Sequence, residues 1–178
     1  REWAEGDLAD AWAAEVLATK GAAPSTSAVA KVGEILLSQG EDHALAQHLG
    51  RHHELASADR LRLAAALRQY LEGERAYAVQ DLDRTRTCLK DALPVLATLH
   101  SDFRFHARLR EIVCRYHEGQ NRWVIEATSQ LLLGIDPERY PSLVGRVRWT
   151  RYLAYSRLGF VAESFADLDT AGSLFRQL

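Results

Sequence analysis

The chain has 178 residues, a formal charge of −2, 47% apolar residues and 26% charged residues. This length is enough to bury the core of one domain, and the small net charge excludes a strong overall field that would attract nucleic acid or a membrane surface. The sequence contains no run of about 18 apolar residues, so it predicts no transmembrane helix. No basic-then-apolar leader opens it either.

The two cysteines, Cys88 and Cys114, each lie within an apolar helical pattern. Buried free thiols fit that placement better than a disulfide does, and free thiols are typical of reducing compartments. We therefore expect a cytoplasmic protein.

Helical signals cover most of the chain, and we find no β-hairpin signal, Gly/Ser linker or low-complexity tract. Gly21 is typical of a helix C-terminus, Ser57 of an N-terminus and Pro141 of a first helical turn. Pro94 lies inside a helical pattern, where it is expected to kink the last turns. The predicted helices, in chain order, cover residues 8–21, 27–40, 42–55, 58–79, 82–100, 102–119, 122–134, 142–159 and 161–178. The sequence predicts an all-α protein.

Junctions between these helices recur at a nearly constant interval. When "EGDLADAW", "QGEDHALA", "VQDLDRTR", "EGQNRWVI" and "LGFVAESF" are aligned, successive anchor positions lie 34, 40, 39 and 40 residues apart. The anchors are Gly6, Gly40, Gln80, Gly119 and Gly159; Ala18, His52, Ala92, Leu131 and Ala171 follow twelve residues later, and Gly33, Gly73, Ile112 and Tyr152 precede by seven. Glycine tolerates the left-handed turn that ends a helix, and small residues allow two helices to approach closely. The interval predicts repeated helical hairpins.

These features resemble the tetratricopeptide repeats. Their pattern of a turn glycine, a small residue in the second helix and a later alanine is matched by Gly159, Ser164 and Ala171, with Tyr155 ahead of the turn. "EGDLADAW" supplies Gly6, Asp7, Leu8 and Ala11 in the same pattern, and "GEILLSQGED" supplies Gly33, Leu36 and Gly40. The sequence departs from the pattern at Gln80, Leu45 and Val124. The resemblance implies a right-handed superhelix of stacked antiparallel hairpins, of the longer kind found in MalT-like and LuxR-type bacterial regulators.

On this interpretation residues 1–178 form a single domain of about four and a half hairpins. "REWAEGD" would be the tail of a first helix and "LADAW" the start of its partner, so the chain would be a segment of a longer array. Solenoid units bury their faces on their neighbours, so the two ends are expected to expose apolar surface that favours homo-oligomers.

Enzymatic chemistry is not indicated. His43, His48, His52 and His53 are close in sequence, but no third metal ligand is evident and a solvated, histidine-rich helix explains them as well. No nucleophile elbow or phosphate-cradling loop is present. The "DLD" carboxylates at 81–83 and 167–169 are expected to be exposed. The sequence therefore predicts no catalytic residue, metal or cofactor.

The resemblance places a ligand groove along the first helices of successive hairpins. It implies the partner-binding residues Tyr70, Glu74, Tyr77, His106, Tyr116, His117, Arg146, Trp149 and Arg157. Leu109 and Val113 fall on the same row but are expected to belong to the core. Rings beside basic groups are enriched at binding hot spots, although the arginine excess also fits a compositional bias of the genome.

Three functions remain open. The first is a protein-interaction or regulatory segment that binds a protein or peptide, including one from another domain of the parent protein. The second is the ligand-sensing part of a MalT-like or LuxR-type transcription activator, and the third is a secretion or assembly chaperone. Direct nucleic-acid binding is not expected, because residues 99–178 carry only 11 basic against 9 acidic side chains.

Overall fold

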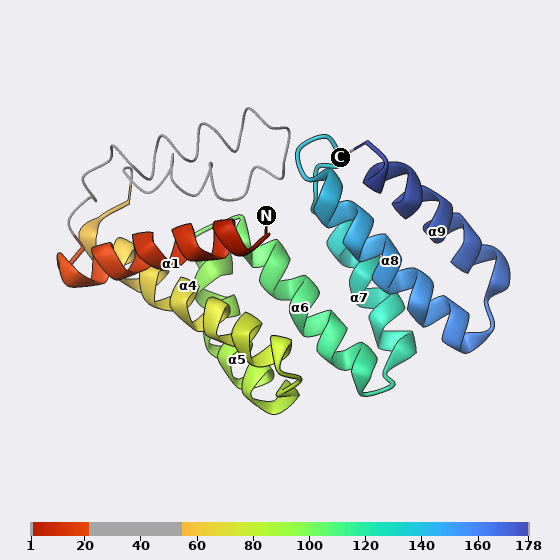
Figure 1. The fold of residues 1–178 in the computed structure, drawn as a ribbon, viewed down its shortest axis with the longest axis horizontal. Helices are drawn as coiled ribbons and strands as arrows, with labels where there is room; N and C mark the ends of the chain where they lie inside the picture. The colour runs from red at the N-terminus through yellow and green to blue at the C-terminus, as the bar shows by residue number, and fades with distance from the viewer. Residues whose placement is uncertain (1, 22–54, 178) are drawn as a thin grey trace. The chain divides into compact units, whose positions relative to one another are not determined.

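The computed structural model describes residues 2–21 and 55–177. Every regular element in these ranges is a helix (Figure 1), which confirms the all-α class. The helices are α1 (Glu2–Ala18), α4 (Ser57–Ala78), α5 (Leu82–Thr98), α6 (Phe103–His117), α7 (Asn121–Leu133), α8 (Pro141–Leu158) and α9 (Val161–Phe175). The helix expected over 27–40, nearly all of that over 42–55, Gly33, Gly40 and the four clustered histidines lie outside the described residues.

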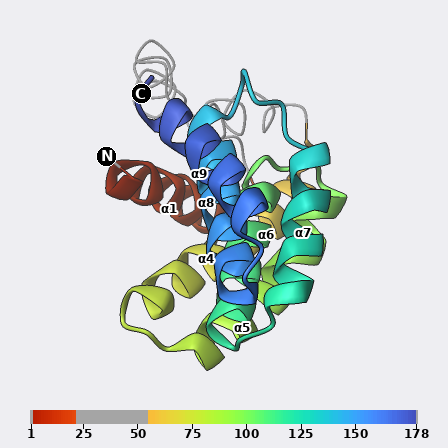
Figure 2. The ribbon, with the colours of Figure 1, turned by 90° about the vertical axis from the view of Figure 1, so that its right-hand side faces the viewer.

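The chain divides into two compact units. Unit 1 holds the described residues up to Ala107, which comprise α1, α4, α5 and the first turn of α6. Unit 2 begins at Arg108 and holds the rest of α6 with α7, α8 and α9. In unit 1, α1 packs on α4 and α4 on α5; in unit 2, α7 packs on α8, and α9 runs back along α8 (Figure 2).

The turn predicted at "EGDLADAW" is wrong, because α1 is continuous from Glu2 to Ala18 and contains Gly6. A glycine inside a helix costs about 1 kcal/mol relative to alanine. The alanine-rich sequence that follows favours a helix, and Trp12 and Val16 anchor α1 in the core with no exposed surface. The first anchor of the repeat pattern and the half-hairpin interpretation of the N-terminus therefore fail.

The anchors Gln80, Gly119 and Gly159 do fall at equivalent turns. Their φ angles are 62°, 78° and 78°, all left-handed. At each anchor the N–H donates to the carbonyl three residues earlier, and the next N–H donates to the carbonyl five residues before it. This pairing closes the C-terminus of the first helix of each hairpin. The hairpins α4–α5, α6–α7 and α8–α9 thus share one turn geometry at spacings of 39 and 40 residues.

Close approach between the two helices of a hairpin is clearest at Gly73. A Cβ atom added at residue 73 would lie 3.3 Å from the Cβ of Cys88, so the backbone of α4 at Gly73 lies close to the side chain of Cys88 on α5. Ala92 is fully buried in the same hairpin, as Ala171 is in α8–α9. Cys88 and Cys114 are buried and free, as expected. The small residues of the repeat pattern therefore mark helix contacts.

The expectation that Asp167 is exposed is wrong, because only 4% of its side chain is accessible. Its carboxylate accepts from Nε and Nη2 of Arg151 at 2.6 and 2.7 Å, and from Nη1 of Arg148 at 3.0 Å. Arg151 also donates to Oγ of Ser129 at 3.0 Å. The hydrogen bond to Asp167 raises the pKa of Arg151. This ion cluster links side chains of α7, α8 and α9. The spacing of residues within a single helix could not predict such a contact between helices.

Candidate binding groove

A groove in unit 2 lies between the second part of α6 and α8. One end is a pocket of about 440 Å³, and its described lining consists of Leu109, Arg110, Val113, Arg146, Trp149, Thr150 and Phe175. Further along the same two helices, Nη1 of Arg157 donates to the carbonyl of Tyr116 at 3.2 Å. We call this surface the α6–α8 groove and define it by Leu109, Val113 and Tyr116 of α6 and Arg146, Trp149 and Arg157 of α8.

Helical spacing explains why these residues share a surface. Leu109, Val113 and Tyr116 are separated by four and three residues, so they follow one face of α6. On α8, Arg146 and Trp149 are one turn apart, and Arg157 lies eight residues further along the same helix. Each helix therefore carries a row of side chains on the side that faces the other helix.

Trp149 is the most accessible ring of the groove. It is 44% exposed, whereas Leu109 in the same pocket is only 3% exposed. The ring of Tyr152 supports it, with centroids 5.2 Å apart. The pocket therefore combines a buried apolar floor with an aromatic surface that a bound side chain can cover.

Phe175 is a pocket residue that sequence reasoning missed. It is the last residue of α9, and its ring lies on the backbone of Gly145 in α8. A Cβ atom at residue 145 would come within 2.7 Å of Cε1 of Phe175, so only glycine leaves room for the ring. The one available signal was Gly145 itself, a glycine inside an otherwise strong helical pattern.

The Arg157 end of the groove carries positive charge on an aromatic platform. The guanidinium carbon of Arg157 lies 4.0 Å from the centroid of the Tyr116 ring. Tyr116 in turn contacts the ring of His117 edge-on, with centroids 5.7 Å apart. Within residues 2–21 and 55–177 no carboxylate forms an ion pair with Arg157, and the side chain is exposed. The guanidinium is thus oriented by the ring while its charge faces water.

The other predicted site residues lie in unit 1 and form different contacts. Tyr70 is 8% exposed, and its ring packs on that of Phe103 with centroids 6.0 Å apart, which places it in the core of unit 1. The ring of His106 lies 6.2 Å from the same phenylalanine. Glu74 and Tyr77 are half-buried on α4. Tyr70 therefore supports packing, and none of these four lines the pocket at Trp149.

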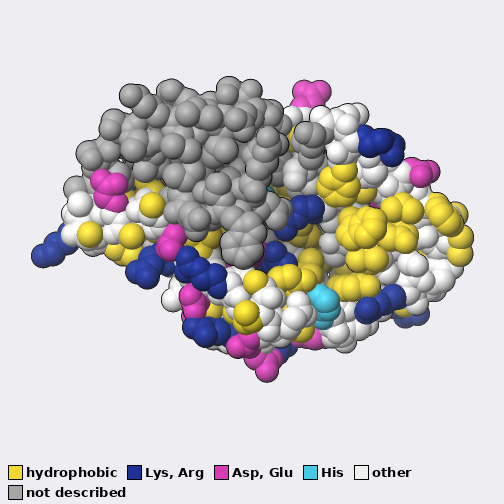
Figure 3. All heavy atoms as spheres, in the orientation of Figure 1, with side chains coloured by type: hydrophobic (Ala, Val, Ile, Leu, Met, Phe, Trp, Pro, Cys, Tyr) yellow, Lys and Arg dark blue, Asp and Glu magenta, His cyan; other side chains and the backbone are white. Residues whose placement is uncertain are grey.

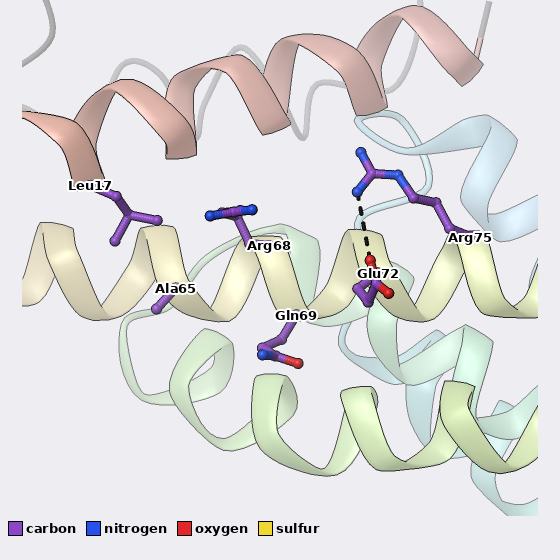
Figure 4. Close-up of a pocket in the computed structure, with 6 residues that line it drawn as sticks. All are labelled: Leu17, Ala65, Arg68, Gln69, Glu72 and Arg75. Carbon is purple, nitrogen blue, oxygen red and sulfur yellow. Dashed lines mark ion pairs between the residues drawn. The ribbon is translucent and has the colours of Figure 1, made fainter.

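A second hollow lies in unit 1 beside α1 and α4 (Figure 4). It measures about 360 Å³, and its described lining consists of Leu17, Ala65, Arg68, Gln69, Glu72 and Arg75. Arg75 pairs with Asp10 at 2.6 Å and with Glu72 at 3.8 Å, and Arg68 approaches Asp10 at 3.8 Å. Exposed pairs of this kind each contribute about 0–1 kcal/mol. Four of its six described lining residues are polar or charged, beside Leu17 and Ala65, so its lining differs from that of the pocket in unit 2.

Comparisons of the chain with protein-family models, curated proteins and solved structures gave no match. Across the described ranges, no three His, Cys, Asp or Glu side chains are grouped to hold a metal ion. No described helix has both the length and the apolar character to cross a bilayer. The chemistry of the α6–α8 groove is therefore the main guide to function.

Proposed function

We propose that the chain is a non-enzymatic, tetratricopeptide-like interaction module that binds an acidic peptide or protein segment in the α6–α8 groove. The observation that carries this proposal is the exposed ring of Trp149 in a pocket floored by Leu109. An aromatic or aliphatic side chain of the partner would enter the pocket, and a carboxylate would reach Arg157. Such a partner is either a separate protein or another segment of the parent protein.

The repeated turns support the architectural part of the proposal. Three hairpins share the same left-handed anchor and the same hydrogen bonds at spacings of 39 and 40 residues. Repeats of this kind stack into a right-handed superhelix whose first helices line a continuous binding surface. α6 and α8 are the first helices of successive hairpins, which is where the groove lies.

The energy available at Trp149 is enough for a hot spot. A tryptophan side chain buries about 150–250 Å² when it is fully covered. With 44% of the residue exposed, a partner would cover roughly 90 Å², which contributes about 2 kcal/mol at about 25 cal/mol per Å². That figure corresponds to about a thirtyfold change in affinity.

Selection from a displayed library of random peptides tests the proposal. We expect the enriched peptides to combine Asp or Glu with one aromatic or leucine residue. Trp149→Ala should weaken their binding about thirtyfold, and Arg157→Ala should weaken it less while reducing its dependence on salt. Leu133→Ala is the matched control, because Leu133 is 82% exposed and outside the groove. Selected peptides that bind parent and Trp149→Ala equally would refute the assignment.

A small-molecule sensor is the second candidate, and the volume of the pocket favours it. Sites for small ligands measure about 300–1,000 Å³, and the pocket of about 440 Å³ falls in that range. This function would belong to a transcription activator of the MalT-like or LuxR type. A thermal-shift screen of small aromatic carboxylates against the parent and Trp149→Ala separates the two, because a sensor would be stabilised by a small ligand alone.

A further inference from the structure

Apolar side chains at the start of α9 are exposed. Val161 and Phe165 are 62% and 58% exposed, and Phe160 just before the helix is 46% exposed. Val161 and Phe165 are four residues apart, so they lie on one stripe of the helix. Hydrophobic side chains also gather on the visible face over α8 and α9 (Figure 3). An exposed apolar stripe of this kind is typical of a helix that docks into a groove.

The charges of α9 are opposite to those of the α6–α8 groove. Residues 161–175 contain Glu163, Asp167 and Asp169 and no Lys or Arg. Asp167 is neutralised by its two arginines, so the charges left for a partner are Glu163 and Asp169. Helix α8 contains no acidic residue, and of its four arginines Arg148 and Arg151 pair with Asp167 while Arg146 and Arg157 belong to the groove. The exposed face of α9 therefore has the composition that the groove selects: apolar side chains at Val161 and Phe165, with the exposed carboxylate of Asp169 one turn beyond Phe165.

The exposed stripe of α9 cannot reach the groove of its own chain. Ser164, Asp167 and Ala171 form the buried face of α9 that packs on α8, which turns Val161 and Phe165 away from it. The stripe therefore does not face the α6–α8 groove of its own unit.

We propose that the α6–α8 groove of one copy binds the Val161–Phe165 stripe of α9 from a second copy. This inference rests on the proposed function and names a partner for the same groove. The groove and the stripe are different surfaces of the same unit, so the contact is head-to-tail. Such contacts do not close on themselves unless the rotation forms a ring, and they otherwise build linear chains. Phe165 would enter the Trp149 pocket, with Asp169, one turn further along the same face of α9, near Arg157.

Sedimentation equilibrium of the full chain from micromolar to millimolar concentration tests this. We expect the average mass to rise with concentration, and to rise less at high salt because the charges are exposed. Phe165→Glu and Trp149→Ala should each remain monomeric. Both positions are exposed, and circular dichroism would verify that each variant folds. Val161→Ser is a milder stripe variant, expected to weaken association about tenfold because it removes apolar contact area.

Mixing the two monomeric variants gives the sharpest result. Trp149→Ala keeps an intact stripe and Phe165→Glu keeps an intact groove, so an equimolar mixture should form dimers that neither forms alone. A mixture that stays monomeric, or a parent protein that stays monomeric at millimolar concentration, overturns the inference. If acidic peptides still bind the parent in a Trp149-dependent manner in that case, the proposed groove function stands and only the second-copy partner is wrong.

Discussion

Removing the carboxylate of Asp167 should destabilise unit 2 far more than removing any exposed ion pair. The Asp167→Ala variant would leave two guanidinium groups facing each other without a counter-charge. The side chain of Arg151 is only 16% exposed and that of Arg148 is 31% exposed. Breaking a buried ion pair by removing one partner costs about 3–5 kcal/mol. Because both arginines retain some access to water, we expect the lower end, about 3 kcal/mol.

Urea unfolding gives the total change in the free energy of unfolding. Amide hydrogen exchange of residues 121–175 shows whether the lost stability belongs to unit 2. The local measurement is needed because the two compact units need not unfold together. Arg62→Ala is the matched control, since Arg62 pairs with Asp59 on the surface at 3.1 Å with 55% of its side chain exposed. That variant should change stability by less than about 1 kcal/mol.

A double variant separates loss of the pair from loss of packing. Arg151→Met combined with Asp167→Leu replaces both charges by apolar groups, and this should cost less than Asp167→Ala alone, because no charge of that pair stays buried. The reasoning is refuted if Asp167→Ala unfolds within about 0.5 kcal/mol of the parent, a value typical of ordinary surface substitutions.

Three further changes test separate parts of the structure. Gln80→Gly should stabilise unit 1 by about 1 kcal/mol in urea unfolding, because glycine removes the cost that a residue with a Cβ atom pays for a left-handed backbone conformation. An unchanged free energy of unfolding would contradict the equivalence with Gly119 and Gly159. Gly145→Ala should change the free energy of unfolding by less than about 1 kcal/mol but push the ring of Phe175 out of the pocket. Its effect on the affinity of selected peptides, measured by calorimetry, should therefore match that of Phe175→Ala. Unequal effects of the two variants would contradict the contact between Gly145 and Phe175. Burial, followed by the charge of Glu72, raises the pKa of the Cys88 thiol above its ordinary value, so the folded chain keeps that proton up to a higher pH than the unfolded chain. The free energy of unfolding should therefore fall as the pH rises from the ordinary thiol pKa to the raised one. Cys88→Ala should abolish that slope, and an unchanged slope would assign it to other groups.

The class and most helix boundaries followed from apolar spacing, glycine and proline. Pro141 begins α8 as expected, and α7 ends at Leu133 just before Gly134. The hairpin turns followed from the interval between Gln80, Gly119 and Gly159. Gly6 misled the same argument, because a glycine also fits inside a helix when the residues after it are good helix formers and are buried.

Sequence spacing could predict contacts along one helix but not contacts between helices. It was the resemblance, and not spacing, that placed Leu109 and Val113 of α6 in one row with Arg146 and Trp149 of α8, and these residues do line one pocket. Phe175 reaches that pocket from another helix, and Asp167 is buried by arginines 16 and 19 residues away. Those contacts depend on how α8 and α9 pack, which no periodic pattern within either helix encodes.

The indole N–H signals in a two-dimensional ¹H–¹⁵N spectrum test the groove most directly. The chain has four tryptophans, and Trp12 is fully buried in unit 1 while Trp149 is exposed in the groove. Titration with a selected acidic peptide should move the Trp149 signal, assigned by its absence from Trp149→Ala, and leave that of Trp12 in place. If the peptide binds and the Trp149 signal stays fixed while another indole moves, the binding site is not the α6–α8 groove.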